Sequence, residues 1–228
     1  MKSLMVMFLL LLTCGCAHKS AVYREDFNDG IAQGWHDPWG FFYGIEKTDE
    51  RGHGPYLFSE ENHWISGEPD LYCWYKERTF KNFVWTLELR DGYNGNTHFW
   101  NGVRYGSGGA GGLSLIFCAA TPAETPSVYY ELYLGGVERG LTLWKKNVAE
   151  NKNLGKTSFS FTRDPDWPRW HKLRLKVVDA EISVYLDDLE TPCLQARDES
   201  LSGGYLGFCA QHFPNYWLID NIIIESLP

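Results

Sequence analysis

The sequence predicts an all-β protein: a single antiparallel β-sandwich, or jelly roll, of about a dozen strands with little or no helix. Three observations lead to this prediction. Apolar residues recur at every second position in many short runs, Gly- and Asn-rich turns separate these runs, and no stretch carries a sustained apolar stripe of period 3.6. The chain has 228 residues, of which 44% are hydrophobic, so it can build a large core.

Four segments alternate between apolar and polar residues, so that one side of each packs and the other meets water. They are 83–90, 128–134, 173–177 and 182–186. In the first, Phe83, Trp85 and Leu89 share the apolar side, which assigns Trp85 to the core. The remaining strand candidates, in chain order, are 22–27, 71–76, 113–119, 141–145, 158–161, 205–210 and 217–225.

Turn residues separate these segments. Gly and Asn accept positive φ angles and therefore favour tight turns. They occur at Asn94-Gly95, Gly135-Gly136 and Ser202-Gly203-Gly204, and Val178-Asp179-Ala180 forms a further turn signal. Residues 148–153 allow one turn of helix at most. Because no linker, repeat or low-complexity segment interrupts the strands, we expect one domain over residues 16–228.

Residues 1–15 have the composition of an export signal. Lys2 precedes an apolar run at 4–12 and a small-residue end, Thr13-Cys14-Gly15-Cys16. The run is too short to span a bilayer, which takes about 20 residues. We therefore expect export, either as a cell-envelope lipoprotein acylated at Cys16 or as a secreted protein cleaved at a plain signal peptidase site nearby. A membrane partner is expected only through such a lipid anchor.

Charge and composition exclude two classes of protein. The 29 Asp and Glu residues outnumber the 21 Lys and Arg, whereas a nucleic-acid-binding protein needs a basic face. Aromatic residues make up 16% of the chain, far more than a disordered chain carries. The glycines form no phosphate-binding motif, and we expect no organic cofactor.

Four cysteines lie in the predicted domain beyond Cys16: Cys73, Cys118, Cys193 and Cys209. An oxidising compartment permits up to two disulfides among them, with three pairings open. Their spacing does not fit a zinc site. Cys118 and Cys209 stand in strongly apolar segments, so buried free thiols are the alternative for that pair.

Residues near both ends of the domain resemble one family. The opening YREDFNDG at 23–30, followed by Gly34-Trp35, is similar to the first strand of concanavalin A-like, or laminin-G-like, β-sandwiches. Residues 170–175, 182–187, 203–208 and 219–222 follow the order of that family's closing strands. The resemblance covers nearly the whole domain and implies the fold, but this fold hosts lectins, binding modules, hydrolases and lyases.

The resemblance also implies a structural Ca²⁺ ion. In resembling sandwiches a calcium ion links an acidic residue before the first-strand Phe to an Asp of the last strand, positions that Asp26 and Asp220 hold here. By alternation Asp220 shares a face with Leu218, Ile222 and Ile224. A carboxylate on such a face needs hydrogen bonds or a cation, and oxygen ligands suit calcium. The alternative is that both are ordinary hydrogen-bonded turn carboxylates.

The paired-carboxylate motif of laminarinase-type hydrolases, Glu-x-Asp-x-x-Glu on one strand, is incomplete in this chain. The nearest segment, EPDLYC at 68–73, ends in Cys73, and Pro69 disfavours a central strand. Asp187-Asp188 has turn chemistry, and Glu60-Glu61 is a loop pair. We therefore do not expect a double-carboxylate retaining mechanism on these residues.

The segment 94–112 is the strongest predicted ligand loop, because long glycine-rich connections are often functional. It contains His98, Trp100, Asn101, Arg104 and Tyr105. Aromatic rings stack on sugar faces, while Asn and Arg bind hydroxyls or uronate carboxylates. The alternative is a surface hairpin whose aromatic side chains only cover the edge of the sandwich.

Other loops add aromatic and His residues. His63-Trp64 and His212 are expected to meet Trp100 and Arg104 on one concave face of the sandwich. We name as ligand-binding residues Trp64, Trp100, Asn101, Arg104 and Tyr105. As candidate catalytic groups we name His63, His98, Arg104, Tyr105 and His212.

Two functions follow from these features. The first is an exported carbohydrate-binding protein that acts on or beside an oligo- or polysaccharide. The second is a glycan-active enzyme, a glycoside hydrolase or polysaccharide lyase, on the same fold. A purely structural surface protein remains a third possibility.

Overall fold

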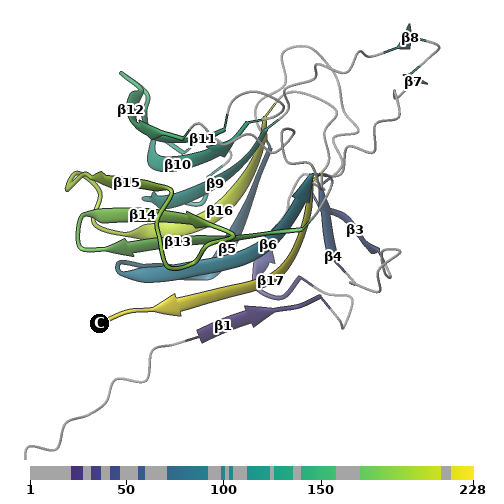
Figure 1. Cartoon of the computed structure of the whole chain (residues 1–228), viewed down its shortest axis with the longest axis horizontal. Coiled ribbons are helices and arrows are strands. Elements are labelled where there is room, and N and C mark those ends of the chain that lie inside the picture. The colour runs from purple at the N-terminus through teal and green to yellow at the C-terminus, as the bar shows by residue number, and fades with distance from the viewer. Residues whose placement is uncertain are drawn as a thin grey trace, which may run out of the picture.

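Two antiparallel β-sheets form the protein in a computed structural model (Figure 1). The structure describes residues 22–27, 32–36, 42–46, 56–59, 71–91, 99–100, 103–104, 112–123, 126–135, 140–157, 170–211 and 217–228. Within these ranges every regular element is a strand, which confirms the predicted all-β sandwich.

The first sheet has eight strands. Its order is β15 (Leu194–Arg197), β14 (Glu181–Leu186), β13 (His171–Val178), β6 (Phe83–Asp91), β17 (Trp217–Ser226), β4 (Tyr56–Ser59) and β3 (Phe42–Glu46). The eighth strand, β1 (Val22–Glu25), pairs with the second half of β17, where Val22 lies opposite Glu225. The first and last strands are therefore adjacent.

The second sheet has seven strands. Its order is β12 (Lys152–Lys156), β11 (Leu141–Asn147), β10 (Val128–Leu134), β9 (Gly112–Ala119), β16 (Gly204–Gln211), β5 (Leu71–Phe80) and β2 (Trp35–His36). A separate antiparallel pair joins β7 (Phe99–Trp100) to β8 (Val103–Arg104).

The core lies between the two sheets. It consists of the apolar residues that alternate with polar ones along the strands. On β13, Leu173, Leu175 and Val177 are buried while Lys172 and Lys176 are exposed. Trp85 is fully buried and lies 5.1 Å from the ring of Phe208 in the facing sheet, which confirms its assignment to the core. Aromatic pairs of this kind add stability beyond area burial.

The structure contains short strands that the sequence did not predict. Residues 148–151 are irregular and Lys152 begins β12, so the segment 148–153, for which the sequence allowed one turn of helix at most, contains no helix. Strands β12 and β15 lie at sheet edges and combine polar with apolar residues, which hides the period-2 signal. The predicted strand at 158–161 lies outside the described residues.

Among the described residues, Cys73, Cys118, Cys193 and Cys209 form no disulfide. Cys73 and Cys209 lie on neighbouring strands, but Cys73 packs in the core between the sheets and Cys209 on the other side of its sheet. Cys118 is buried, and burial raises the pKa of its thiol to about 12. The alternative of buried free thiols is thus confirmed for Cys118 and Cys209.

Residues 1–15 and Cys16 lie outside the described residues. In the part of the chain that the structure does describe, no helix is both long and apolar enough to cross a membrane.

Candidate functional site

The predicted ligand loops are only partly described. Trp100 and Arg104 lie on the paired strands β7 and β8, where Trp100 is opposite Val103 and Arg104 opposite Phe99. The other predicted ligand-binding and catalytic residues lie outside the described residues: His63, Trp64, His98, Asn101, Tyr105 and His212. Their convergence on one face stays a prediction.

Asp26 and Asp220 come from the adjacent first and last strands. Glu25 lies opposite Ile222, so Asp26 follows at the level of Asn221, next to Asp220 in the chain. The Asp220 carboxylate accepts the backbone N–H of Asn221 at 2.7 Å and is 5% exposed. The backbones of Asp26 and Asn221 are therefore close, but the Asp26 side chain is exposed while that of Asp220 is buried.

The predicted facing of Asp220 is wrong because β17 contains a bulge. Asn221 has φ +50°, and the register with β6 shifts between Asp220 and Ile223. The extra residue reverses the alternation, so that Ile219 and Ile222 both pack in the core. Among the described residues no three acidic, His or Cys side chains are grouped to hold a metal, and calcium at Asp26 and Asp220 stays a prediction.

The outer side of the seven-stranded sheet, which we call the outward face, carries an unusual set of aromatic and polar residues. Hydrogen-bonded partners in adjacent strands share a face. The register therefore gives one row across five strands: Trp74, Gly207, Ile116, Glu131 and Trp144. Beside this row lie Tyr72, Ser114, Tyr129, Tyr133, Lys146 and Cys209.

One half of the outward face is filled by a second apolar cluster. Its buried members are Tyr72, Trp74, Ile116, Ala119 and Cys209. The Tyr72 and Trp74 rings stack with centroids 5.7 Å apart, and the indole N–H of Trp74 donates to the carbonyl of Ala123 at 3.1 Å. This half is packing rather than an open surface.

The other half, on β10 and β11, holds an anchored ammonium group beside an accessible indole. Glu131 is only 1% exposed, and its carboxylate accepts a hydrogen bond from Ser114 Oγ at 2.7 Å. Lys146 Nζ lies 3.0 Å from the second oxygen of Glu131 and 5.3 Å from the ring centroid of Trp144. The Lys146 side chain is 24% exposed, and Trp144 is partly exposed.

This arrangement is electrostatically compensated. A buried carboxylate is costly unless it is paired and hydrogen-bonded, and Ser114 and Lys146 do both for Glu131. In return the carboxylate fixes the flexible Lys146 side chain close to the indole, where a cation is attracted by the ring. A flat ring and a positioned hydrogen-bond donor can together hold a sugar.

Sequence reasoning missed this half of the face. It left Trp144 without a facing and did not single out Glu131 or Lys146. A signal was present in 128–134, where Tyr129, Glu131 and Tyr133 occupy the side opposite the apolar residues. A row of aromatic and charged side chains on the water-facing side of a strand indicates more than solubility.

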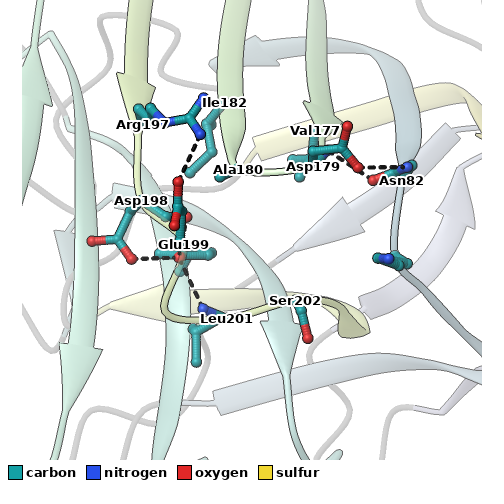
Figure 2. Close-up of a pocket in the computed structure, with 12 residues that line it drawn as sticks. Asn82, Val177, Asp179, Ala180, Ile182, Arg197, Asp198, Glu199, Leu201 and Ser202 are labelled. Atoms are coloured by element: carbon teal, nitrogen blue, oxygen red, sulfur yellow. Dashed lines mark hydrogen bonds and ion pairs between the residues drawn. The ribbon is translucent and has the colours of Figure 1, made fainter.

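A pocket of about 250 Å³ at one end of the sandwich is the other candidate (Figure 2). Its lining comes from the turn after β5, the turn between β13 and β14, and the connection from β15 to β16. Most of its charged groups already bind one another. Arg197 contacts Glu181 and Glu199 at 2.6 Å each, and the Asn82 side chain contacts that of Asp179 at 3.4 Å.

Asp198 and Tyr130 also line the pocket and form a second hydrogen-bonded group there. The Tyr130 hydroxyl donates to Asp198 Oδ1 at 2.8 Å. Burial raises the pKa of Asp198, but hydrogen bonds from Ser200 and Tyr130 outweigh it and bring the pKa down to about 2. Burial also raises the pKa of Tyr130 to about 12. These groups tie the end of the sandwich together, so the outward face is the stronger candidate site.

Comparison with known proteins identifies solved structures with a similar fold. No family model matches the chain, and no curated protein matches its sequence. Among solved structures, a carbohydrate binding module, CBM66, from Bacillus subtilis aligns with TM-score 0.55 and 13% identity, covering 85% of this chain and 96% of that one. A Bacillus licheniformis beta-glucanase aligns with TM-score 0.54 and 9% identity, covering 93% and 100%.

A third structure, a Bacillus subtilis protein described as having a galectin-like fold, aligns with TM-score 0.55 and 15% identity, covering 90% of this chain and 94% of that one. At such low identities the likeness concerns the fold alone. The chain is a two-sheet sandwich of the kind found in these three proteins, consistent with the concanavalin A-like sandwich that its sequence resembles.

Proposed function

We propose that this is an exported carbohydrate-binding protein, and that its glycan lies on the outward face against Trp144 and Lys146. The observation that carries the proposal is the accessible indole beside an ammonium group that a buried carboxylate holds in place. Stacking on the indole supplies contact area, and the ammonium supplies a directed donor for a sugar oxygen.

The fold comparison supports this proposal in general terms. Two of the similar structures are a carbohydrate binding module and a beta-glucanase, and proteins with this sandwich place many different sites on it. The site on this chain therefore has to be tested on its own residues.

The test is binding to a panel of polysaccharides by affinity electrophoresis and calorimetry. We expect Trp144→Ala to weaken binding roughly fivefold or more, since an aromatic contact contributes about 1 kcal/mol beyond burial. The melting temperature should change little, because Trp144 is partly exposed.

Tyr185→Ala is a matched control. Tyr185 lies on the eight-stranded sheet, is partly exposed and has Arg174 6.0 Å from its ring centroid, so it repeats the aromatic–cation pair away from the outward face. Trp100→Ala tests the predicted loop site in parallel.

Unchanged affinity in Trp144→Ala for every glycan that the protein binds would show that Trp144 is not part of the site.

A glycan-active enzyme is the second candidate function, and the buried Glu131 beneath the outward face is the observation in its favour. A retaining hydrolase needs two carboxylates about 5–5.5 Å apart. The described strand positions of β9, β10 and β11 supply Glu131 alone to this face. Incubation with the same panel, followed by assays for reducing ends and for unsaturated uronates, separates turnover from binding.

A further inference from the structure

We infer that the glycan is anionic, carrying carboxylate or sulfate groups; this rests on the proposed function of the outward face. The observation is that Trp144 stands between two lysines. Lys146 lies two residues further along β11, and Lys156 of β12 lies beside Thr142, two residues before Trp144.

The strand register places Lys146 and Lys156 on the same face of the sheet as Trp144. Leu141 and Leu143 pack in the core, so Thr142 and Trp144 point to the outward face. Lys156 is the partner of Thr142 in β12 and shares its face. The register between β11 and β12 shifts between Leu143 and Trp144, but this bulge does not turn Lys156 to the other side of the sheet. Beyond it Asn153 lies opposite Trp144 on the outward face, and Leu154 packs against the core.

The two ammonium groups are held differently. Lys146 gives one contact to Glu131 and keeps further N–H donors available. Lys156 is exposed, and it forms no ion pair with any residue that the structure describes. Of the described residues around Trp144, two lysines and one carboxylate thus lie on its face, although the chain as a whole has a net charge of −8.

Such a surface favours an acidic sugar chain. A ring stacked on Trp144 extends towards a lysine on either side, and carboxylate or sulfate oxygens accept stronger, charge-assisted hydrogen bonds than hydroxyls do. The two lysines lie at the levels of residues 142 and 146 of β11, a separation of roughly 14 Å at the rise of a β-strand. That spacing suits an oligomer better than a single sugar.

The test compares acidic polymers with their neutralised forms. Polygalacturonate is paired with its carboxyl-reduced derivative, and chondroitin sulfate with chondroitin that has been both desulfated and carboxyl-reduced. Chondroitin that has lost only its sulfates keeps its uronate carboxylates, so a third comparison with it distinguishes a uronate from a sulfate ligand. We expect one acidic form to bind roughly tenfold tighter than its neutralised counterpart. That advantage should shrink when NaCl is raised from about 50 mM to about 500 mM, because salt screens exposed charges.

Lys156 is the residue to change, because removal of Lys146 would leave the buried Glu131 charge without its cation. We expect Lys156→Gln to weaken binding of the acidic polymer roughly threefold to fivefold, in the range of an exposed charge contact, and Lys156→Arg to restore it. The neutralised polymer should bind both variants as it binds the original protein. Lys176→Gln, at an exposed position of the other sheet, is the control.

Equal affinity for acidic and neutralised polymers, with no effect of Lys156→Gln, would overturn the anionic ligand while leaving glycan binding intact. The proposed function fails separately, when no glycan binds or when Trp144→Ala leaves every affinity unchanged.

Discussion

At the scale of single residues, two carboxylates are held by their neighbours in different ways. Glu131 is buried on a sheet face and owes its compensation to one ammonium and one hydroxyl group. Asp198 lies at the end of the sandwich and accepts hydrogen bonds from Tyr130 and from the backbone and side chain of Ser200. For Asp198 the hydrogen bonds favour the charged form and lower its pKa.

The ionisation of Asp198 gives a stability that depends on pH. Its folded pKa of about 2 is below the ordinary value of about 3.9, so the stabilisation is complete above about pH 4 and is lost as the pH falls through 2. We expect Asp198→Asn to lower the free energy of unfolding by about 1–2 kcal/mol at pH 7 and by much less near pH 2. Urea unfolding at the two pH values measures this.

The control is Glu199→Gln, which changes an exposed carboxylate in the same connection and should have little effect at either pH. An equal loss of stability in Asp198→Asn at pH 7 and near pH 2 would contradict the assignment of the low pKa.

At the scale of elements, alternation predicted the long central strands and failed at the edges. The sequence predicted β6, β10, β13 and β14 because their apolar faces pack on the facing sheet and therefore alternate with polar residues. The bulges were not readable, since an extra residue in one strand depends on how its neighbour pairs, as at Asn221. For the same reason the candidate site escaped prediction: Glu131, Trp144 and Lys146 meet only through strand register.

Gly207 in β16 permits the close packing of the outward face. A Cβ at this position would lie 2.6 Å from the carbonyl oxygen of Cys73 and 2.6 Å from the indole of Trp74. We expect Gly207→Ala to destabilise the protein by about 1–3 kcal/mol, the cost of overpacking a well-filled interior. Thermal or urea unfolding provides the measurement.

Gly155→Ala is the matched control, because a Cβ there would meet the Leu194 side chain at an ordinary 3.5 Å. We expect it to be close to neutral. A tolerated Gly207→Ala would mean that Trp74 can shift without loss.

At the scale of the whole molecule, the chain closes on itself through β17. This strand pairs with β1, β4 and β6, and thereby joins the first strand to the middle of the eight-stranded sheet. Aromatic contacts such as Trp85–Phe208 then hold this sheet to the other. The stability of the junction between β1 and β17 therefore affects the entire fold.

The predicted calcium ion belongs to this junction. If Asp26 and Asp220 bind Ca²⁺, EDTA should lower the melting temperature and added CaCl₂ should restore it, because a ligand that binds only the folded state stabilises it. Asp26→Asn should abolish the response to EDTA. Metal analysis that finds no calcium in protein equilibrated with saturating Ca²⁺ would reject the site.

The central place of β17 has a consequence for biosynthesis. The residues of β17 leave the ribosome after those of β1, β4 and β6. The strands on the two sides of β17 therefore cannot join into one sheet until β17 has been synthesised. Pairing of residues so distant in sequence is slow to form, because a long loop has to close first. A nascent chain interrupted before residue 217 should therefore remain sensitive to protease, and resistance should appear only after β17 has been released.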